Sequence, residues 1–453
     1  MFDALFTTTT EYKKLSHALS GKGACALFGL PASGRAQVYA ALCRQLDKPL
    51  CIVTPGEAEA TRFAADLNTL GIPAAVFPAR DYVLRPIEGT AREYEYRRLA
   101  VLGELVGGRL RAVAVPAEAL TQFTTPKEDF CANTRTLHAG DTLLRDDLLA
   151  ALFGAGYTRR AQVDGPGQFS VRGDIVDIFA PDQKMPVRME FWGDEIDTLH
   201  TFDLTTQRRE DAIDKFYLSP AREVLFGKPA DAAEQLRAFL AKQRGKKKTA
   251  MADCMAADLD LLDGGAVPVN MDKYLAVRYP HPATVLDYFD DPILVAEEPA
   301  SIREADRATA YRRGEELKSL IPDGVLCAGL DNLYADPSYL WSKTGHYRTI
   351  CAENFARSMP DQPLKDIINA PAHTLPAWNG EVAGLLEDLK PLCDAGYTVT
   401  LLAGTDRAAA GLARDLRDKG ILVTTDAAAA PATVRRMIFC AWYKDFINIQ
   451  VVL

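Results

Sequence analysis

The strongest constraint on the fold is the alternation of short apolar runs with helical stretches in the first 120 residues. The apolar runs lie at residues 24–28, 50–53, 74–77 and 111–115, with helical stretches between them at 38–46, 57–70 and 92–105. Buried strands that alternate with helices are typical of a parallel sheet covered by helices on both faces. The sequence therefore predicts an α/β domain in this region.

A different pattern follows from about residue 125. Three segments alternate between apolar and polar residues, namely Phe169–Arg172, Val187–Trp192 and Leu199–Phe202, and glycines separate them. Period-two alternation with glycine-containing turns indicates an antiparallel sheet with one buried face. A helical stretch at 146–153 precedes these segments. We interpret the region as an inserted β-rich domain.

These patterns predict an α/β fold class with five regions. A P-loop-type parallel α/β domain has two parts, residues 1–124 and 213–345, which flank the inserted β-rich domain at 125–212. A small α/β domain is expected at 346–430, where helical stripes again alternate with an apolar strand. Residues 431–453 are expected to form an atypical tail.

Composition limits the classes of function. The chain has 52 Lys and Arg against 61 Asp and Glu, and this net charge of −9 excludes a generally basic nucleic-acid coat protein. A local basic patch remains compatible with that sum. No apolar run approaches the roughly 18 residues of a membrane span. The nine cysteines and six histidines are scattered, so we expect a cytoplasmic protein with reduced thiols, no metal site and no cofactor.

The segment from Gly29 to Ala36 has the setting of a phosphate-binding loop, because it follows a strand and opens a helix. Such a loop needs a Lys that reaches the phosphates and a hydroxyl that holds Mg²⁺. Here Arg35 stands in place of the Lys and Ala36 in place of the Ser or Thr. We interpret Gly29, Gly34, Arg35 and Ala36 as a degenerate nucleotide loop. The alternative is a working site in which Arg35 pairs with a phosphate.

A nucleotide-hydrolysing enzyme of this class also needs an acidic pair after an apolar strand. The nearest literal match is Asp194–Asp197, which directly follows Gly193 between two alternating segments. That position is typical of a hairpin turn rather than the end of a buried parallel strand. The sequence therefore predicts no acidic box and no catalytic residue.

Arginine and aromatic residues gather between Tyr157 and Asp174. These residue types are the usual anchors of protein interfaces. The alternative is an ordinary solvated face of a sheet, on which scattered arginines are common.

The stretch Gly165–Phe179 (GPGQFSVRGDIVDIF), followed by Glu190–Asp197 (EFWGDEID) and Phe202–Arg208 (FDLTTQR), resembles one family. It is similar to the module shared by the excision-repair protein UvrB and the transcription-repair coupling factors of the Mfd family. With the upstream loop, the resemblance covers about residues 20–345.

Two features favour the Mfd family over UvrB. UvrB keeps an intact P-loop, which this chain lacks. UvrB also carries a tyrosine-rich hairpin that wedges into DNA, whereas the corresponding stretch here, Phe77–Pro86, holds only Tyr82. A duplex wedge needs stacked aromatic side chains.

The resemblance implies that the inserted β-rich domain binds UvrA, the damage sensor, through Arg159, Phe169 and Arg172. UvrB has a further Arg where this chain has Ser170, so one contact lacks a counterpart. Period-two alternation places Phe169 and Arg172 on opposite faces. Phe169 is therefore either a surface contact or a core residue beneath the face that Arg172 presents.

The resemblance implies that the chain is the N-terminal, non-motor part of a transcription-repair coupling factor, which recruits UvrA to stalled transcription complexes. In the full-length family, the motor domains and the regions that bind RNA polymerase and DNA lie further along the sequence. We expect a monomer that does not bind membranes, and an N-terminal portion or truncated product. The alternative function is a UvrB-like ATP-dependent DNA helicase subunit.

Overall fold

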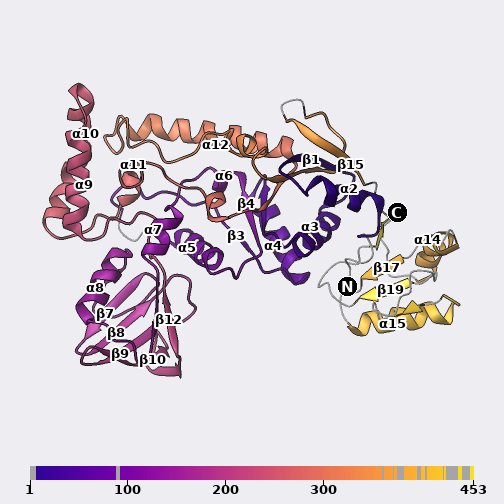
Figure 1. The fold of residues 1–453 in the computed structure, drawn as a ribbon, viewed down its shortest axis with the longest axis horizontal. Coiled ribbons are helices and arrows are strands. Elements are labelled where there is room, and N and C mark those ends of the chain that lie inside the picture. Colours follow the sequence, from indigo (N-terminus) through magenta and orange to yellow (C-terminus); the bar gives the residue numbers. More distant parts are fainter. Residues whose placement is uncertain are drawn as a thin grey trace.

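The computed structural model describes residues 7–87, 92–359, 362–370, 372–374, 382–394, 399–402, 406–421, 423–424, 437–440 and 449–452. Figure 1 shows a central sheet flanked by helices, with the inserted strands and a group of helices on one side of it. Across these described residues, no helix combines the length and apolar character needed to cross a membrane.

The central sheet of the described residues has seven parallel strands in the order β15-β1-β14-β13-β2-β4-β3. The strands are β1 Gly23–Phe28, β2 Leu50–Thr54, β3 Ala74–Val76, β4 Ala112–Pro116, β13 Ile293–Glu297, β14 Arg348–Glu353 and β15 Leu364–Asn369. The predicted parallel α/β sheet is confirmed. Parallel neighbours require crossover connections, so adjacent strands come from distant parts of the chain.

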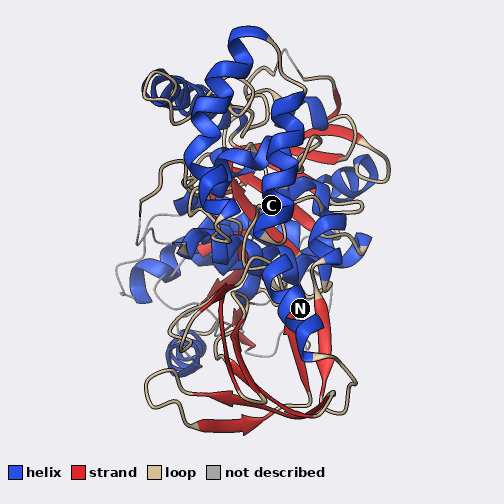
Figure 2. Ribbon diagram, turned by 90° about the vertical axis from the view of Figure 1, so that its left-hand side faces the viewer, coloured by secondary structure: helices blue, strands red, loops and turns tan. Residues whose placement is uncertain are grey.

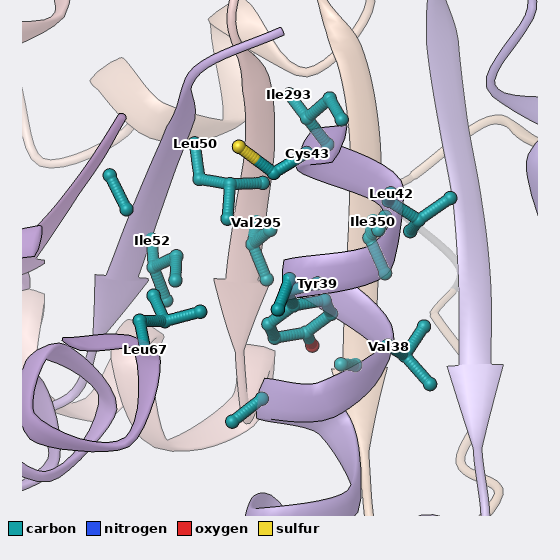
Figure 3. Packing of buried hydrophobic residues seen from close by; sticks show 14 of the residues in the cluster. Val38, Tyr39, Leu42, Cys43, Leu50, Ile52, Leu67, Ile293, Val295 and Ile350 are labelled. Carbon is teal, nitrogen blue, oxygen red and sulfur yellow. The ribbon is translucent and has the colours of Figure 1, made fainter. Parts of the chain in front are cut away.

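Helices cover both faces of this sheet. They are α2 Thr10–Ala18, α3 Ala32–Leu46, α4 Glu57–Thr69, α5 Glu93–Val106, α6 Ala117–Leu120, α7 Lys127–Ala132, α12 Pro299–Leu320 and α13 Tyr339–Lys343. Strand residues alternate between two apolar cores because successive side chains point to opposite faces. Figure 3 shows one core, in which Val38, Tyr39 and Leu42 of α3 pack on the sheet. The helix and sheet therefore hold the end of the Gly29–Ala36 loop in place.

The inserted domain contains a six-stranded sheet in the order β11-β10-β9-β8-β7-β6. Its strands are β6 Thr158–Arg159, β7 Gln168–Arg172, β8 Ile175–Phe179, β9 Val187–Trp192, β10 Glu195–Phe202 and β11 Arg209–Ala212. The pairs are antiparallel except β6–β7, which is parallel. Helix α8, Arg145–Gly154, packs on one face through a shared apolar core. The predicted separate β-rich sheet is confirmed, and Figure 2 shows its strands gathered at the lower end of the view.

Strand pairing extends past two of the predicted boundaries. Strand β12, Lys215–Leu218, pairs with β5, Arg135–His138, although it follows the predicted end of the insertion at residue 212. Strands β14 and β15 lie in the central sheet, although they follow the predicted boundary at residue 345. We therefore propose that the inserted domain ends near residue 220 and the main domain near residue 370.

A helical cluster lies inside the region predicted as the second part of the α/β domain. It comprises α9 Pro229–Ala241, α10 Gly245–Asp263, α11 Leu275–Arg278 and the short 3-10 helix η1 Met271–Tyr274, while η2 Val285–Tyr288 follows on the sheet. The cluster has its own core, to which Leu236, Met251 and Leu330 contribute. The sequence patterns did not predict this separate core.

The last described elements are α14 Val382–Asp394, α15 Asp406–Asp418 and a second mixed sheet in the order β16-β20-β17-β19-β18. Its strands are β16 Ala372–Thr374, β17 Val399–Leu402, β18 Val423–Thr424, β19 Met437–Cys440 and β20 Ile449–Val452. Strands β19 and β20, from the predicted tail, both pair with β17. Residues 431–436, 441–448 and 453 of that tail lie outside the described residues.

Candidate functional site

The Gly29–Ala36 segment connects β1 to α3, as the sequence predicts, but helix replaces most of the loop. Gly29 has a φ of 93°, and α3 begins at Ala32, so Ser33 and Gly34 already have helical conformation. The backbone N–H of Arg35 donates to the carbonyl of Pro31 at 3.0 Å, the first bond of that helix. This N–H group is therefore engaged within the protein rather than directed at a ligand.

The side chain of Arg35 is engaged as well. It is only 3% exposed, and its guanidinium lies 3.0 Å from Oε2 of Glu297 and 2.9 Å from Oε1 of Glu298. Glu297 is the last residue of β13, and it also accepts a hydrogen bond from the Tyr39 hydroxyl. Arg35 and Tyr39, both on α3, thus meet the carboxyl end of a central strand.

This contact overturns the expectation that the chain lacks an acidic pair. The apolar run Ile293–Ala296 ends in Glu297 and Glu298 at the carboxyl edge of the parallel sheet. Asp194–Asp197 holds three acidic residues in four, which makes it the denser match in the sequence. The latter residues do lie where β9 turns into β10, and Gly193 there has a φ of 63°.

Burial sets the electrostatics of the cluster around Arg35. Because Glu297 is fully buried, its pKa rises to about 7, and the opposing effects of Arg35 and the Tyr39 hydrogen bond lower it only in part. Ala36 packs in the apolar core and offers no hydroxyl. The arrangement provides one buried cation whose charge is already balanced by two carboxylates.

The residues predicted to bind UvrA occupy three different environments. Phe169 is fully buried and packs against α8, with its ring 5.2 Å from that of Phe153. Of the two positions left open by the sequence, Phe169 therefore takes the core position. Its neighbour Ser170 is buried on the opposite face of β7.

Arg172 lies on the same face of β7 as Ser170. Its Nη2 is 2.6 Å from Oδ2 of Asp177, a buried carboxylate that also pairs with Arg188 at 2.7 and 3.0 Å. The Arg172 side chain remains 48% exposed. A buried carboxylate thus fixes the direction of a half-exposed cation, while Arg188 supplies the charge balance beneath it.

Arg159 is not beside Arg172. It pairs in register with Phe169 across β6 and β7, and paired residues of neighbouring strands share a face. Arg159 therefore lies on the Phe169 side of the sheet, where it lines a cleft of about 790 Å³. The structure separates the two arginines that the resemblance grouped together.

Trp192 is a surface residue that the sequence analysis missed. It is 83% exposed at the end of β9, on the same face as Arg188 and Glu190 by the period of two. Ile175 pairs in register with both Arg172 and Glu190, so these three residues form a row across β7, β8 and β9. Trp192 lies two residues beyond Glu190 along β9. We call Arg172, Ile175, Glu190 and Trp192 the docking face. The sequence signal for this exposure is that Trp192 takes a position of β9 at which the alternation of Arg188 and Glu190 predicts a polar residue.

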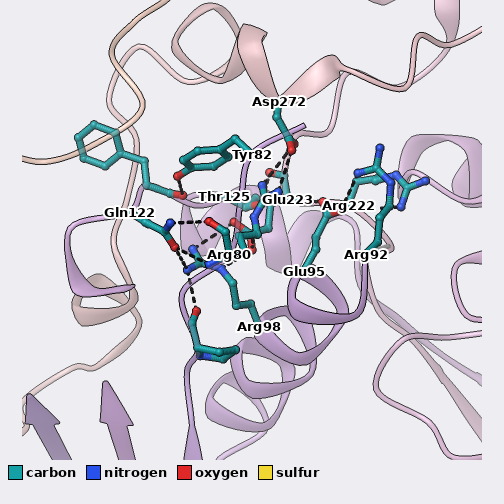
Figure 4. Close-up of polar contacts among 12 residues, drawn as sticks. Arg80, Tyr82, Arg92, Glu95, Arg98, Gln122, Thr125, Arg222, Glu223 and Asp272 are labelled. Carbon is teal, nitrogen blue, oxygen red and sulfur yellow. Dashed lines mark hydrogen bonds and ion pairs between the residues drawn. The ribbon is translucent and has the colours of Figure 1, made fainter. Parts of the chain in front are cut away.

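A buried charge network joins the main domain to the segment that follows the inserted domain and to the helical cluster. The Nε of Arg98 donates a hydrogen bond to Glu223, which follows β12, at 2.6 Å. Arg80 pairs with Asp272 at 2.7 Å (Figure 4). Tyr82, from the stretch Phe77–Pro86 that the resemblance compares with the UvrB hairpin, is buried against the helical cluster. This stretch therefore packs inside the protein.

Comparison with known proteins identifies the relatives of this chain. Residues 136–224 match the UvrB interaction domain family. A transcription-repair-coupling factor of Bacillus subtilis (strain 168) is 25% identical over 406 residues, which is 87% of this chain and 34% of that protein. One from Staphylococcus aureus (strain MRSA252) is 24% identical over 387 residues, covering 83% of this chain and 33% of the relative.

The similarity is higher over a shorter stretch of a third relative. A transcription-repair-coupling factor of Myxococcus xanthus is 35% identical over 208 residues, which is 44% of this chain and 17% of that protein. The chain spans about a third of the length of the first two relatives. The predicted resemblance is thus confirmed: this chain is similar over most of its length to about a third of the transcription-repair-coupling factors, and its residues 136–224 match the UvrB interaction domain.

Proposed function

We propose that this chain is a protein-docking platform of transcription-coupled repair, which recruits UvrA through its inserted β-rich domain. The matched UvrB interaction domain and the relationship to transcription-repair-coupling factors support this role. The contacts with RNA polymerase and DNA that the family resemblance implies belong to the longer protein in this proposal.

The observation that carries the proposal is the docking face. Arg172 is half-exposed yet held in one direction by Asp177, and Trp192 stands exposed on the same face, two strands away on β9. Interface hot spots are enriched in Trp and Arg, and a pre-oriented side chain loses less conformational entropy on binding. An Arg that already pairs with a carboxylate of its own chain can also bind a carboxylate of a partner protein, because its guanidinium has five N–H donors.

We further infer that docking requires no bound nucleotide. A phosphate would have to displace Glu297 and Glu298 from Arg35, and a bound Mg²⁺ would find no hydroxyl at Ala36. The residues of the loop therefore do not fit a Mg·ATP complex, and we derive no step through one.

A second candidate, a UvrB-like ATP-dependent helicase subunit, is favoured by one observation only. The acidic pair Glu297–Glu298 stands where such an enzyme needs carboxylates. An ATPase assay with and without DNA separates the two functions. We expect no turnover above background, and turnover that disappears in a Glu298→Gln variant would favour the enzyme.

Capture of purified UvrA by this chain tests the docking function. We expect Arg172→Ala and Trp192→Ala each to weaken capture by about 30-fold or more, the effect of losing a hot spot of about 2 kcal/mol. The thermal melt of Trp192→Ala should stay unchanged, because substitutions at exposed positions alter stability by about 0.5 kcal/mol or less. Arg172→Ala should lower the melting temperature only slightly, because Arg188 still pairs with the buried carboxylate of Asp177.

Two matched variants control for loss of any exposed Arg or aromatic residue. Arg135→Ala removes an exposed Arg from β5, and Tyr311→Ala removes an exposed aromatic ring from α12. Neither should change capture. If the unmodified chain fails to capture UvrA, the proposed function is wrong. If capture survives in both docking-face variants, UvrA binds elsewhere on the chain.

A further inference from the structure

The cleft that contains Arg159 lies where three parts of the chain meet. Its volume is about 790 Å³, within the range of ligand-binding clefts. The inserted domain contributes Arg159 and the end of α8, the main domain contributes α5, and the helical cluster contributes residues 226–232 and 265–271. The docking face, on the opposite side of the inserted sheet, takes no part in it.

Positive charge collects along this cleft, and two of its arginines have no partner among the described residues. In the part of the chain that the structure describes, the side chains of Arg159 and Arg160 have neither a hydrogen bond nor an ion pair, and both are exposed. Arg222 also lines the cleft, 3.2 Å from the Tyr96 hydroxyl and 3.9 Å from Glu95. Asp164 is the exposed acid among the lining residues, since the other, Asp272, is buried against Arg80.

The same cleft carries exposed apolar side chains. Ile87 and Val267 are 59% and 57% exposed, and Phe153 and Val269 are exposed as well. Of the twelve large hydrophobic residues exposed among the described residues, these four line this one cleft. Exposed apolar groups that cluster beside polar ones mark interaction sites, whereas single exposed residues need no explanation.

The walls of the cleft are held at fixed separation. A Cβ on Gly167 would lie 2.8 Å from the Tyr96 hydroxyl, and a Cβ on Gly156 would lie 2.8 Å from Cγ of Arg222. The two glycines let the inserted domain approach the main domain this closely. Together with the buried Arg98–Glu223 pair, these contacts give a preformed groove, which lowers the entropy cost of binding.

We propose that this cleft binds an acidic protein segment with aliphatic side chains. Carboxylates of the segment would pair with Arg159 and Arg160, and its aliphatic groups would cover Ile87, Val267 and Val269. Charge complementarity identifies this occupant, because the cleft gathers unpaired cations in a chain of net charge −9. Single-stranded nucleic acid fits less well, since three of the four apolar residues are aliphatic and bases stack on aromatic rings.

The test measures binding of a fluorescein-labelled peptide of alternating Glu and Leu, followed by fluorescence anisotropy with the full chain. We expect saturable binding that weakens with salt, and at least about tenfold weaker binding when Gln replaces Glu. The double variant Arg159→Glu, Arg160→Glu should bind the Glu–Leu peptide at least about tenfold more weakly than the unmodified chain does. Arg135→Glu, an exposed Arg outside the cleft, should bind as the unmodified chain does.

A second pair of variants tests the apolar wall. Val267→Ser should weaken binding, whereas Leu261→Ser, a change at an exposed residue of α10 outside the cleft, should not. A thermal melt checks the folding of each variant. If the double variant Arg159→Glu, Arg160→Glu does not fold, the double variant Arg159→Gln, Arg160→Gln takes its place. The proposal is overturned if the unmodified chain does not bind the peptide, if both Arg pairs leave binding intact, or if a single-stranded oligonucleotide binds more tightly than the peptide.

Discussion

Replacing Arg35 by Met should destabilise the main domain by an amount that depends on pH. Arg35 and Glu297 are both buried, and their charged atoms lie 3.0 Å apart. Met keeps most of the length of the side chain but leaves the Glu297 carboxylate without its cation. Breaking a buried ion pair by removing one partner costs about 3–5 kcal/mol. We expect this loss in the free energy of unfolding at about pH 8.

The sign of the pH dependence follows from Glu297. Its pKa is raised by burial to about 7 from the ordinary 4.5, so the folded protein binds more protons than the unfolded chain between those values. Stability from this group is therefore fully present below about pH 4.5 and is lost as pH rises through about 7. Without Arg35 the pKa of Glu297 rises further. At about pH 5 the Glu297 carboxyl is protonated with or without Arg35, so the cost of Arg35→Met should be smaller there than at about pH 8 by at least about 1 kcal/mol.

Urea unfolding at the two pH values, followed by tryptophan fluorescence, measures this difference. The double variant Arg35→Met, Glu297→Gln is the matched control, because a neutral amide needs no cation and its oxygen can still accept from Tyr39. The double variant should recover most of the loss at about pH 8. Equal losses at both pH values, or no recovery in the double variant, would refute the assignment of Arg35 as the counter-ion of a buried carboxylate.

Three further predictions concern the inserted domain and its attachment. Phe169→Ala should cost about 3–5 kcal/mol in chemical denaturation, because the ring is fully buried against α8; a cost below about 1 kcal/mol would place the ring outside the core. Gly167→Ala should lower the melting temperature more than Gly173→Ala, since both have positive φ but only the former meets Tyr96; equal shifts would contradict the close approach. Neighbouring arginines hold the pKa of Glu95 at about 2, so its contribution should be lost as pH falls from about 4.5 toward 2; an unchanged acid titration of stability in Glu95→Gln would refute this.

Local periodicity was enough to predict the two sheets. Apolar runs gave the early parallel strands, and period-two alternation gave the inserted sheet, because both patterns depend only on nearby residues. The helical cluster was missed for the opposite reason. Its core combines residues as distant as Tyr82, Leu236 and Leu330, and no short window contains that pattern. The placement of β14 between β1 and β13 is likewise a long-range pairing.

The candidate site likewise has features that local periodicity predicts and features that depend on long-range pairing. Alternation along one strand predicted that Phe169 and Arg172 face opposite ways, and the structure places them so. The position of Arg159 depends instead on the parallel register between β6 and β7, which a sequence does not reveal. Trp192 was visible in the alternation of β9 as a large apolar residue at a polar position, yet its exposure became clear only from the fold.

Arg35 shows how a sequence pattern and a structure can assign different meanings to one substitution. In the sequence, Arg in place of Lys and Ala in place of Ser or Thr indicate only the loss of ligand-binding groups. In the structure, Arg35 contacts Glu298, a residue 263 positions away, and balances the charge of Glu297. Since one guanidinium engages both carboxylates, the same contact occupies the cation that a phosphate would need and the acids that a metal would need. The loop and the acidic pair therefore engage each other, and this contact leaves neither of them free for Mg·ATP.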